Sequence, residues 1–89
     1  MGTMQITSAK MLANAVRDQR KAQSRTQSDT AKLVGIKQTT VSAFENNPES
    51  TKLETLFKLL AALDLELHVQ PRNTNTEPHT TQQKWNEEW

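Results

Sequence analysis

Residues 26–46 read TQSDTAKLVGIKQTTVSAFEN, and they have the residue types and spacing of two short helices joined by a tight turn. Thr26 is a natural N-cap, and Asp29 places a carboxylate at the favourable end of the helix dipole. These signals predict a helix over residues 27–34. Gly35 follows where that helix must end, because a residue without a Cβ atom takes the left-handed conformation cheaply.

The remainder of this stretch predicts a second helix with one apolar face. The apolar positions of this helix, and of the turn that leads into it, are Ile36, Val41 and Phe44. In the preceding helix, Ala31 and Val34 are expected to point inward. Two helices that cross near a right angle need a small residue where they touch, a glycine in the turn and branched or aromatic side chains between them. The outer face of the second helix carries polar or small residues, namely Lys37, Gln38, Thr39, Ser42 and Ala43.

This pattern resembles the helix-turn-helix of the phage-repressor-like family (Xre, or Cro/CI). The residues that agree at fixed spacing are Ala31, Gly35, Ile36, Val41 and Phe44. An αα-hairpin in an unrelated helical bundle would explain the apolar residues. It would not explain the polar and small side chains on the outer face of the second helix, which are of types that can contact DNA bases. The resemblance also implies that Arg20 pairs with Glu45, and losing one partner of such a buried pair typically costs about 3–5 kcal/mol. The alternative for these two residues is a pair of exposed charges.

Composition indicates one small domain. The chain has 89 residues, which places it near the size where a single core is marginal. It has no cysteine, which excludes disulfides and thiolate metal sites. It also has no apolar run of membrane-spanning length and no signal pattern, so we expect a cytoplasmic protein.

Charge is divided unevenly along the chain. Residues 1–46 hold seven Lys or Arg and three acids, whereas residues 47–89 hold four Lys or Arg and seven acids. The basic half contains the helix-turn-helix. The acidic half is either a face for a different partner or a solvated surface, and charge alone favours neither.

A first helix is predicted from its candidate N-cap, Ser8, to about residue 23, with Leu12, Ala15 and Val16 on one face. In the phage-repressor-like family, two positions in this part of the chain are usually leucine, one is commonly glycine and one is apolar. In this chain all four positions are polar. Each departure weakens the core between the first two helices, so we infer a monomer of low stability, which favours dimerisation. These residues are Gln19 and Thr30, Ser24, and Arg25, respectively.

A fourth helix is predicted over about residues 52–63, after a proline-containing loop at residues 46–50. Thr51 and Glu54 have the spacing of a capping box at its start. The apolar face of this helix is wide enough to pack on two sides, against the other helices of the domain and against a further surface outside them. Its helically spaced apolar residues are Leu53, Leu56, Phe57, Leu60 and Leu63, and Leu59, Ala61 and Ala62 widen it.

Residues 64–70 read DLELHVQ, in which polar and apolar residues alternate with the period of a strand. The chain offers no other strand, so we expect this one to pair antiparallel with its copy across a two-fold axis. An irregular extended segment is the alternative. The predicted dimer interface over the fourth helix comprises Leu63, Leu65, Leu67 and Val69.

The predicted fold is therefore mainly α: a four-helix repressor-like helix-turn-helix domain at residues 8–70, plus one C-terminal β-strand that pairs across a homodimer. Residues 1–7 are expected to be disordered. Residues 71–89 contain no aliphatic residue and are expected to form a disordered tail. Trp85 and Trp89 in this tail are typical of a motif that docks in a partner's pocket, and the alternative is a functionless tail.

Two recognition helices on such a dimer would enter successive major grooves, about 34 Å apart, of a palindromic operator in double-stranded DNA. Gln38 suits a bidentate hydrogen bond to adenine, and Lys37 can reach guanine or a phosphate. The predicted base-reading residues are Lys37, Gln38, Thr39, Ser42 and Ala43. The predicted phosphate contacts are Gln27 and Ser28, with Asn46 a weaker candidate.

The short helix-turn-helix, the GIKQ and FENNP stretches, the single strand and the tryptophan-ended tail together resemble HipB-type antitoxins over residues 8–70. This resemblance implies a homodimer that represses its own operon, is nucleoid-associated when bound to its operator, and binds a HipA-type serine/threonine kinase toxin. Trp89 is the first choice for the toxin contact, and Trp85 is its neighbour. A free-standing Xre-family repressor without a toxin is the alternative.

An enzyme is not expected. His68 and His79 are isolated, and the sequence has no Gly-rich phosphate loop and no cluster with metal-ligand spacing. No cofactor or metal is therefore expected, and His68 is interpreted as a surface or interface residue.

Overall fold

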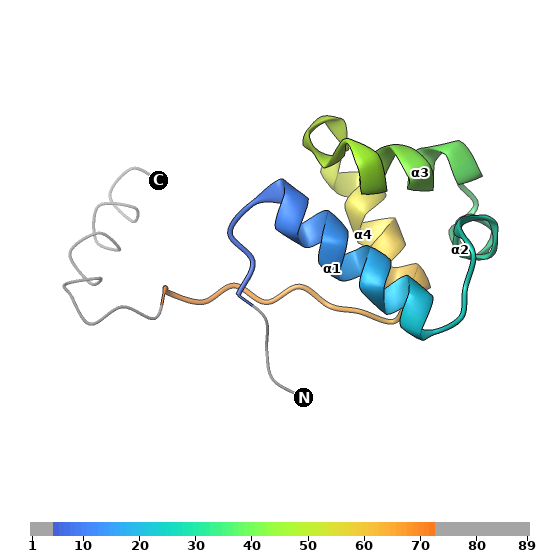
Figure 1. The fold of residues 1–89 in the computed structure, drawn as a ribbon. Helices are drawn as coiled ribbons and strands as arrows, with labels where there is room; N and C mark the ends of the chain where they lie inside the picture. Colours follow the sequence, from blue (N-terminus) through green and yellow to red (C-terminus); the bar gives the residue numbers. More distant parts are fainter. Residues whose placement is uncertain (1–4, 73–89) are drawn as a thin grey trace.

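The computed structural model describes residues 5–72. It contains four α-helices and one short 3₁₀ turn in this part of the chain: α1 (Ala9–Ala22), α2 (Gln27–Val34), α3 (Gln38–Asn46), η1 (Pro48–Ser50) and α4 (Leu53–Ala62). Figure 1 shows α3 across the top of the molecule, α2 at its right-hand end, and α1 and α4 beneath α3. The predicted mainly α, four-helix fold is confirmed.

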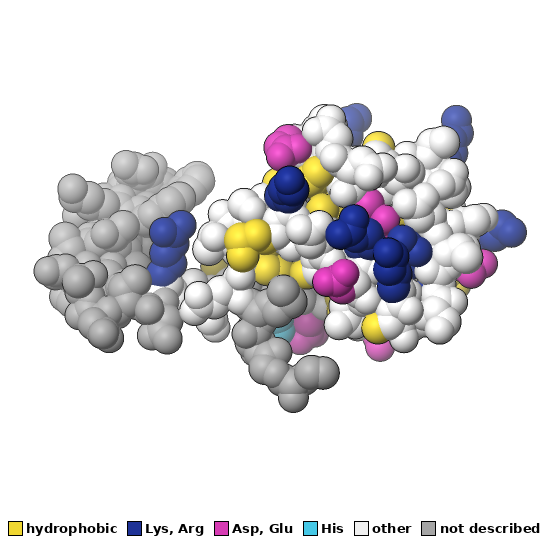
Figure 2. All heavy atoms as spheres, in the orientation of Figure 1, with side chains coloured by type: hydrophobic (Ala, Val, Ile, Leu, Met, Phe, Trp, Pro, Cys, Tyr) yellow, Lys and Arg dark blue, Asp and Glu magenta, His cyan; other side chains and the backbone are white. Residues whose placement is uncertain are grey.

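Basic and acidic side chains are mixed on the face drawn in Figure 2. A group of Lys and Arg side chains lies over the C-terminal half of α1, and acidic side chains lie beside it. The uneven distribution of charge along the chain therefore does not become two separate faces in this view.

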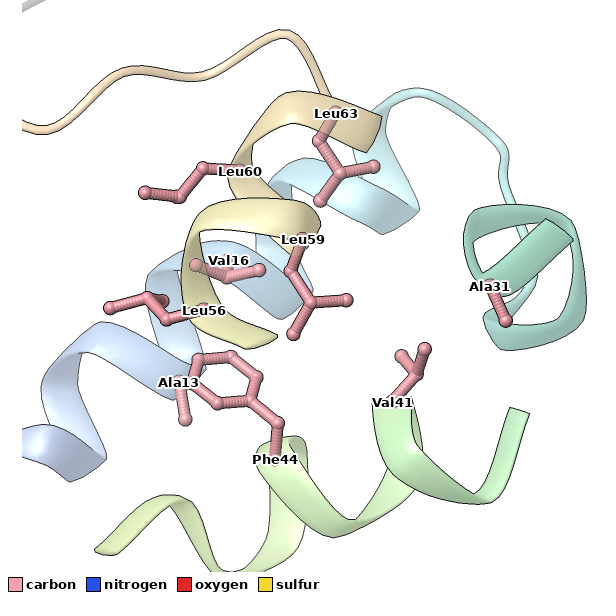
Figure 3. Close-up of a cluster of buried hydrophobic side chains, with 9 residues drawn as sticks. All are labelled: Ala13, Val16, Ala31, Val41, Phe44, Leu56, Leu59, Leu60 and Leu63. Atoms are coloured by element: carbon pink, nitrogen blue, oxygen red, sulfur yellow. The ribbon is translucent and has the colours of Figure 1, made fainter. Parts of the chain in front are cut away.

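The hydrophobic core draws residues from all four α-helices. In Figure 3, Phe44 of α3 points between α1 and α4, and Val41 points toward Ala31 of α2. Ala31 is buried, as expected for the small residue at which the two helices touch. The buried cluster consists of Ala13, Val16, Ala31, Val41, Phe44, Leu56, Leu59, Leu60 and Leu63.

The apolar arc of α4 is only partly used by its own chain. Leu56, Leu60 and Leu63 are buried as predicted, but Leu53 and Phe57 expose 71% and 52% of their surface. Both lie at the edge of the buried arc, one turn apart, where no other helix of the described chain covers them. These two residues form an apolar stripe that the described chain leaves exposed.

The start of α4 also differs from the prediction. The Thr51–Glu54 capping box does not form, because Thr51 belongs to the preceding turn, where its N–H donates to the Pro48 carbonyl at 3.0 Å. Lys52 is the N-cap instead, and its side chain makes no capping hydrogen bond. The predicted loop thus contains a 3₁₀ turn with proline at its first position, and it shifts the helix start to Leu53.

Two predicted N-caps are confirmed. Ser8 Oγ accepts from the N–H of Met11 at 3.1 Å. Thr26 and Asp29 form a reciprocal capping box at 2.9 and 3.1 Å. The Thr26 N–H that donates to the Asp29 carboxylate holds the pKa of that group below its ordinary value of 3.8.

Three helices end on a residue in the left-handed conformation. Gly35 has φ +70° as predicted, but Ser24 and Asp64, with φ 58° and 59°, carry side chains there. Asp64 therefore ends α4, so that the extended segment begins at Leu65 and not at residue 64. The N–H of the next residue closes each turn by reaching back five positions, from Arg25 to Arg20 O (3.1 Å), from Ile36 to Ala31 O (3.0 Å) and from Leu65 to Leu60 O (2.8 Å).

Two of the four polar residues that depart from the family pattern, Thr30 and Arg25, form specific side-chain hydrogen bonds. Thr30 is completely buried, and its hydroxyl donates to the Thr26 carbonyl at 3.0 Å. Arg25 Nη1 donates to the Ala62 carbonyl at 2.8 Å, and Gln23 Nε2 donates to the Leu63 carbonyl at 2.8 Å. The connection between α1 and α2 therefore satisfies carbonyls at the C-terminus of α4.

We expect Ser24→Gly to stabilise the protein. A left-handed residue with a side chain costs about 1–2 kcal/mol, and glycine's greater freedom in the unfolded chain offsets part of the gain. The free energy of unfolding, measured by urea titration with circular dichroism, should rise by about 0.5–1 kcal/mol. Lys21→Gly, in the last turn of the same helix, should lower it by about 1 kcal/mol. A Ser24→Gly variant no more stable than the parent would contradict strain at this residue.

Candidate nucleic-acid interface

A buried ion pair joins α1 to α3. Arg20 Nε donates to Glu45 Oε2 at 2.7 Å, and Arg20 Nη2 donates to Glu45 Oε1 at 3.1 Å. Their side chains expose only 10% and 4% of their surface. Arg20 Nη1 donates to the Arg25 carbonyl at 2.8 Å, so the third guanidinium nitrogen is also used within the protein. The pair predicted from the family resemblance is present, and the alternative of two exposed charges is wrong.

Hydrogen bonds lead from this pair to the surface of α3. Glu45 Oε1 also accepts from Gln27 Nε2 of α2 at 3.0 Å. Gln27 Oε1 in turn accepts from Gln38 Nε2 at 2.5 Å. The series Arg20–Glu45–Gln27–Gln38 therefore connects three helices, from a buried charge to an exposed amide.

The chemistry of the series orients each amide. An ionised carboxylate only accepts hydrogen bonds, so Glu45 requires the NH₂ group of Gln27 to face it. The Gln27 oxygen must then face outward, where it accepts from the NH₂ group of Gln38. Gln38 is left with its side-chain oxygen and a second N–H for a partner outside the protein. This side chain is thus presented in one orientation and not as a free rotor.

The other predicted base-reading residues share the outer face of α3 with Gln38. Lys37, Thr39 and Ala43 are exposed, and Ser42 is half-buried. Lys37 is the N-cap residue of α3, and its side chain makes no capping hydrogen bond. The structure thus brings together the whole set proposed to read bases.

The three predicted phosphate-contact residues have different surroundings. Ser28 is exposed in the first turn of α2 and lines, with Arg20, Thr26, Gln27 and Gln38, an open hollow between α2 and α3. Asn46 is exposed, but its Nδ2 donates to Ser42 Oγ at 3.2 Å. Gln27 is half-buried and bridges Glu45 to Gln38.

Sequence reasoning missed the bridging position of Gln27. Gln27 and Gln38 are eleven residues apart and lie on different helices, so no helical spacing marks them as neighbours. Only the crossing of α2 and α3 places the two amides together. Their occurrence at the first position of each helix is the one signal available in the sequence.

The residues predicted for the dimer interface divide into two groups. Leu63 is a core residue that exposes 1% of its surface, so it has almost no area to offer to a second copy. Leu65 packs at the edge of the core, whereas Leu67 and Val69 expose 48% and 92%. No strand is assigned within residues 5–72, and pairing across a dimer stays a prediction.

Three residues discussed from the sequence lie outside the part of the chain that the structure describes. The tryptophans predicted to contact a toxin, Trp85 and Trp89, lie outside the described residues, as does His79. Among residues 5–72, no group of three or more His, Cys, Asp or Glu side chains is placed to hold a metal ion. None of the helices in that range is both long and apolar enough to cross a membrane.

Residues 16–69 match the model of a helix-turn-helix family (HTH_3). The chain is 44% identical over 89 residues to antitoxin HipB of Escherichia coli (strain K12), and the match covers the whole chain and 99% of that protein. The chain belongs to the HipB family of helix-turn-helix proteins. A second HipB, from Escherichia coli O6:H1, is 48% identical over 67 residues, which are 75% of this chain and 71% of that protein.

Solved HipB structures share the fold. A chain of a HipB–O4 20mer complex has a TM-score of 0.75 and 46% identity, with 76% of this chain and 96% of that chain covered. A chain of a HipA–HipB–O2–O3 complex has a TM-score of 0.77 and 43% identity, with 81% of this chain and 100% of that chain covered. The likeness thus extends over almost all of the HipB chains in both complexes.

We expect Glu45→Gln to destabilise the protein strongly, because it leaves the buried Arg20 charge without its counter-ion. The free energy of unfolding should fall by about 3–5 kcal/mol in urea titrations. Glu49→Gln changes an exposed carboxylate in η1 and should have an effect within about 0.5 kcal/mol. Equal stability of the two variants would contradict a structural role for the ion pair.

Proposed function

We propose that this HipB-family chain is a sequence-specific, operator-DNA-binding antitoxin of a type II toxin–antitoxin system. It acts in the cytoplasm as a homodimer that represses its own operon, and it binds and neutralises a HipA-type serine/threonine kinase toxin. The observation that carries this proposal is the 44% identity to a HipB antitoxin over the full 89 residues. The oriented Gln38 amide on the exposed face of α3 supplies the matching chemistry.

Gln38 is the central base-reading residue in this proposal. Adenine offers an N6 amino donor and an N7 acceptor in the major groove. The free oxygen of Gln38 would accept from N6, and its remaining N–H would donate to N7. Because Gln27 already holds the amide in this orientation, binding orders fewer rotamers than for an unrestrained glutamine. The full base-reading set is Lys37, Gln38, Thr39, Ser42 and Ala43.

Phosphate contacts would hold the recognition helix in register. Ser28, exposed at the N-terminus of α2, would approach the backbone with the first-turn amides of that helix. Gln27 would contact a phosphate from the hollow it shares with Ser28 and Gln38, and Asn46 would make a contact from the C-terminal end of α3. These contacts position the protein and carry no base preference themselves.

We expect Gln38→Ala to weaken operator binding by about 1–3 kcal/mol and to relax preference at one base pair of each half-site. The measurement is a band-shift titration on duplexes from the chain's own promoter region, with single-base substitutions in each half-site. Gln19→Ala removes an exposed glutamine from α1 and serves as the control. A Gln38→Ala variant with unchanged affinity and unchanged base preference would remove α3 as the reading element.

The second partner is the toxin. The known structures that resemble this chain include a HipA–HipB–O2–O3 complex, and this chain matches all of the HipB chain compared. DNA binding needs only the helix-turn-helix and a two-fold partner, so it gives no reason for the two tryptophans near the C-terminus. We assign the toxin contact to Trp89, with Trp85 beside it, because tryptophan is enriched among the residues that dominate interface energies.

We expect truncation after Arg72 to abolish or strongly weaken toxin binding while leaving operator affinity unchanged. Loss of a tryptophan hot spot of 2 kcal/mol or more corresponds to a decrease of about 30-fold or more. The measurement is calorimetric titration with a HipA-type kinase toxin, for the truncated chain and, beside it, for a Trp89→Ala variant of the full chain. Toxin affinity equal to that of the full chain would exclude the tail from the interface. A full chain that binds operator but no such kinase would leave the repressor role alone.

A further inference from the structure

The C-terminal half of α1 carries two positive charges on its outer side. Arg17 and Lys21 are four residues apart, so their side chains share one face of the helix, about 6 Å apart along its axis. Lys21 is exposed and Arg17 is half-buried. Figure 2 shows Lys and Arg side chains gathered over this part of α1.

The described chain makes little use of these two charges. Within residues 5–72, neither side chain belongs to an ion pair. Arg17 Nη2 donates to Asn14 Oδ1 at 3.1 Å, but the Nε of Arg17 is covered and has no hydrogen-bond partner in this range. A covered donor without a partner is unfavourable. Arg17 therefore loses little when its side chain swings outward to an acceptor.

The two residues border the surface proposed to bind DNA. Arg20 lies between them in the sequence and lines the open hollow between α2 and α3 together with Ser28 and Gln38. At 3.6 residues per turn, Arg17 and Lys21 are rotated from Arg20 by about 60° and 100° around the helix axis, in the same sense. The basic side of α1 is thus continuous with the hollow.

We propose that Arg17 and Lys21 contact phosphates of the operator, beyond those reached from the N-terminus of α2. This inference rests on the proposed function and adds to it a DNA contact on α1. Phosphate fits the chemistry of the two residues, because both side chains only donate hydrogen bonds and both carry a permanent positive charge. Their separation of one helical turn allows them to hold different phosphates of one strand.

Asp18 gives the proposal a second handle of opposite sign. It follows Arg17 directly, is exposed, and is the one acidic residue of α1. A carboxylate beside a phosphate-binding surface lowers the positive potential of that surface. Neutralising Asp18 should therefore strengthen DNA binding, whereas neutralising Arg17 or Lys21 should weaken it. A solvated helix face without a DNA contact would show neither effect.

The salt dependence of DNA binding by the full chain tests the contact. Each phosphate contact adds about 0.9 to the steepness of log K against log salt. A two-fold dimer carries each substitution twice, so Arg17→Gln or Lys21→Gln should reduce the steepness by about 2. The affinity advantage of the parent over either variant should then shrink about 10-fold between about 50 and 200 mM salt.

The measurement is a fluorescence anisotropy titration with two duplexes, one from the chain's own promoter region and one of the same length with a scrambled sequence. Phosphate contacts carry no base preference, so both duplexes should lose affinity equally. Asp18→Asn should strengthen binding to both by about 2-fold or more at the lower salt. Arg17→Lys keeps the charge and should keep the steepness. Lys58→Gln removes an exposed lysine from α4 and should leave it unchanged.

Circular dichroism melts of each variant would establish that it is folded. Steepness equal to that of the parent in both Arg17→Gln and Lys21→Gln would overturn the α1 contact, while operator binding by the parent would leave the proposed function intact. An equal reduction in Lys58→Gln would reveal a general effect of net charge and would also overturn the contact. A parent chain that binds neither duplex would overturn both proposals.

Discussion

The buried pairing of Arg20 with Glu45 is the constraint on which the exposed face of this domain depends. Two desolvated charges are tolerated only when their remaining donors and acceptors are also satisfied. Arg20 meets this condition with two bonds to Glu45 and one to the Arg25 carbonyl, and Glu45 meets it by also accepting from Gln27. Rotation of α3 relative to α1 would leave a buried charge unpaired, so the orientation of α3 is set from inside the protein.

The orientation of the surface amides follows from this buried charge. A carboxylate accepts only, so the alternation of donor and acceptor propagates outward from Glu45 through Gln27 to Gln38. The DNA-reading chemistry proposed for Gln38 is thus coupled to the stability of the domain. A side chain ordered before binding costs less to immobilise in a complex.

Polar residues also join the connection between α1 and α2 to the end of α4, because Arg25 and Gln23 donate to carbonyls there. Exposed apolar side chains lie elsewhere, among them Leu53 and Phe57 of α4 and Leu67 and Val69 after it. A second copy is the partner that the proposed function supplies for such a surface. If the segment after α4 pairs with the same segment of that copy, each would satisfy backbone groups that lack a strand partner within residues 5–72.

The sequence by itself determined what depends on neighbours within about one helical turn. The Thr26 cap, the left-handed Gly35 and the spacing of Val41 and Phe44 were predictable because caps and apolar faces follow local geometry. The pairing of Arg20 with Glu45 came from family resemblance, since nothing local relates residues on different helices. Only the tertiary structure decided which α4 residues are covered, that η1 takes Thr51 away from a capping box, and that Gln27 bridges to Gln38. The covering of α4 and the Gln27–Gln38 contact arise between different helices, and local spacing carries no information about such contacts. The position of Thr51 results from competition between two adjacent turns, and the residue pattern alone does not show which of them is the more stable.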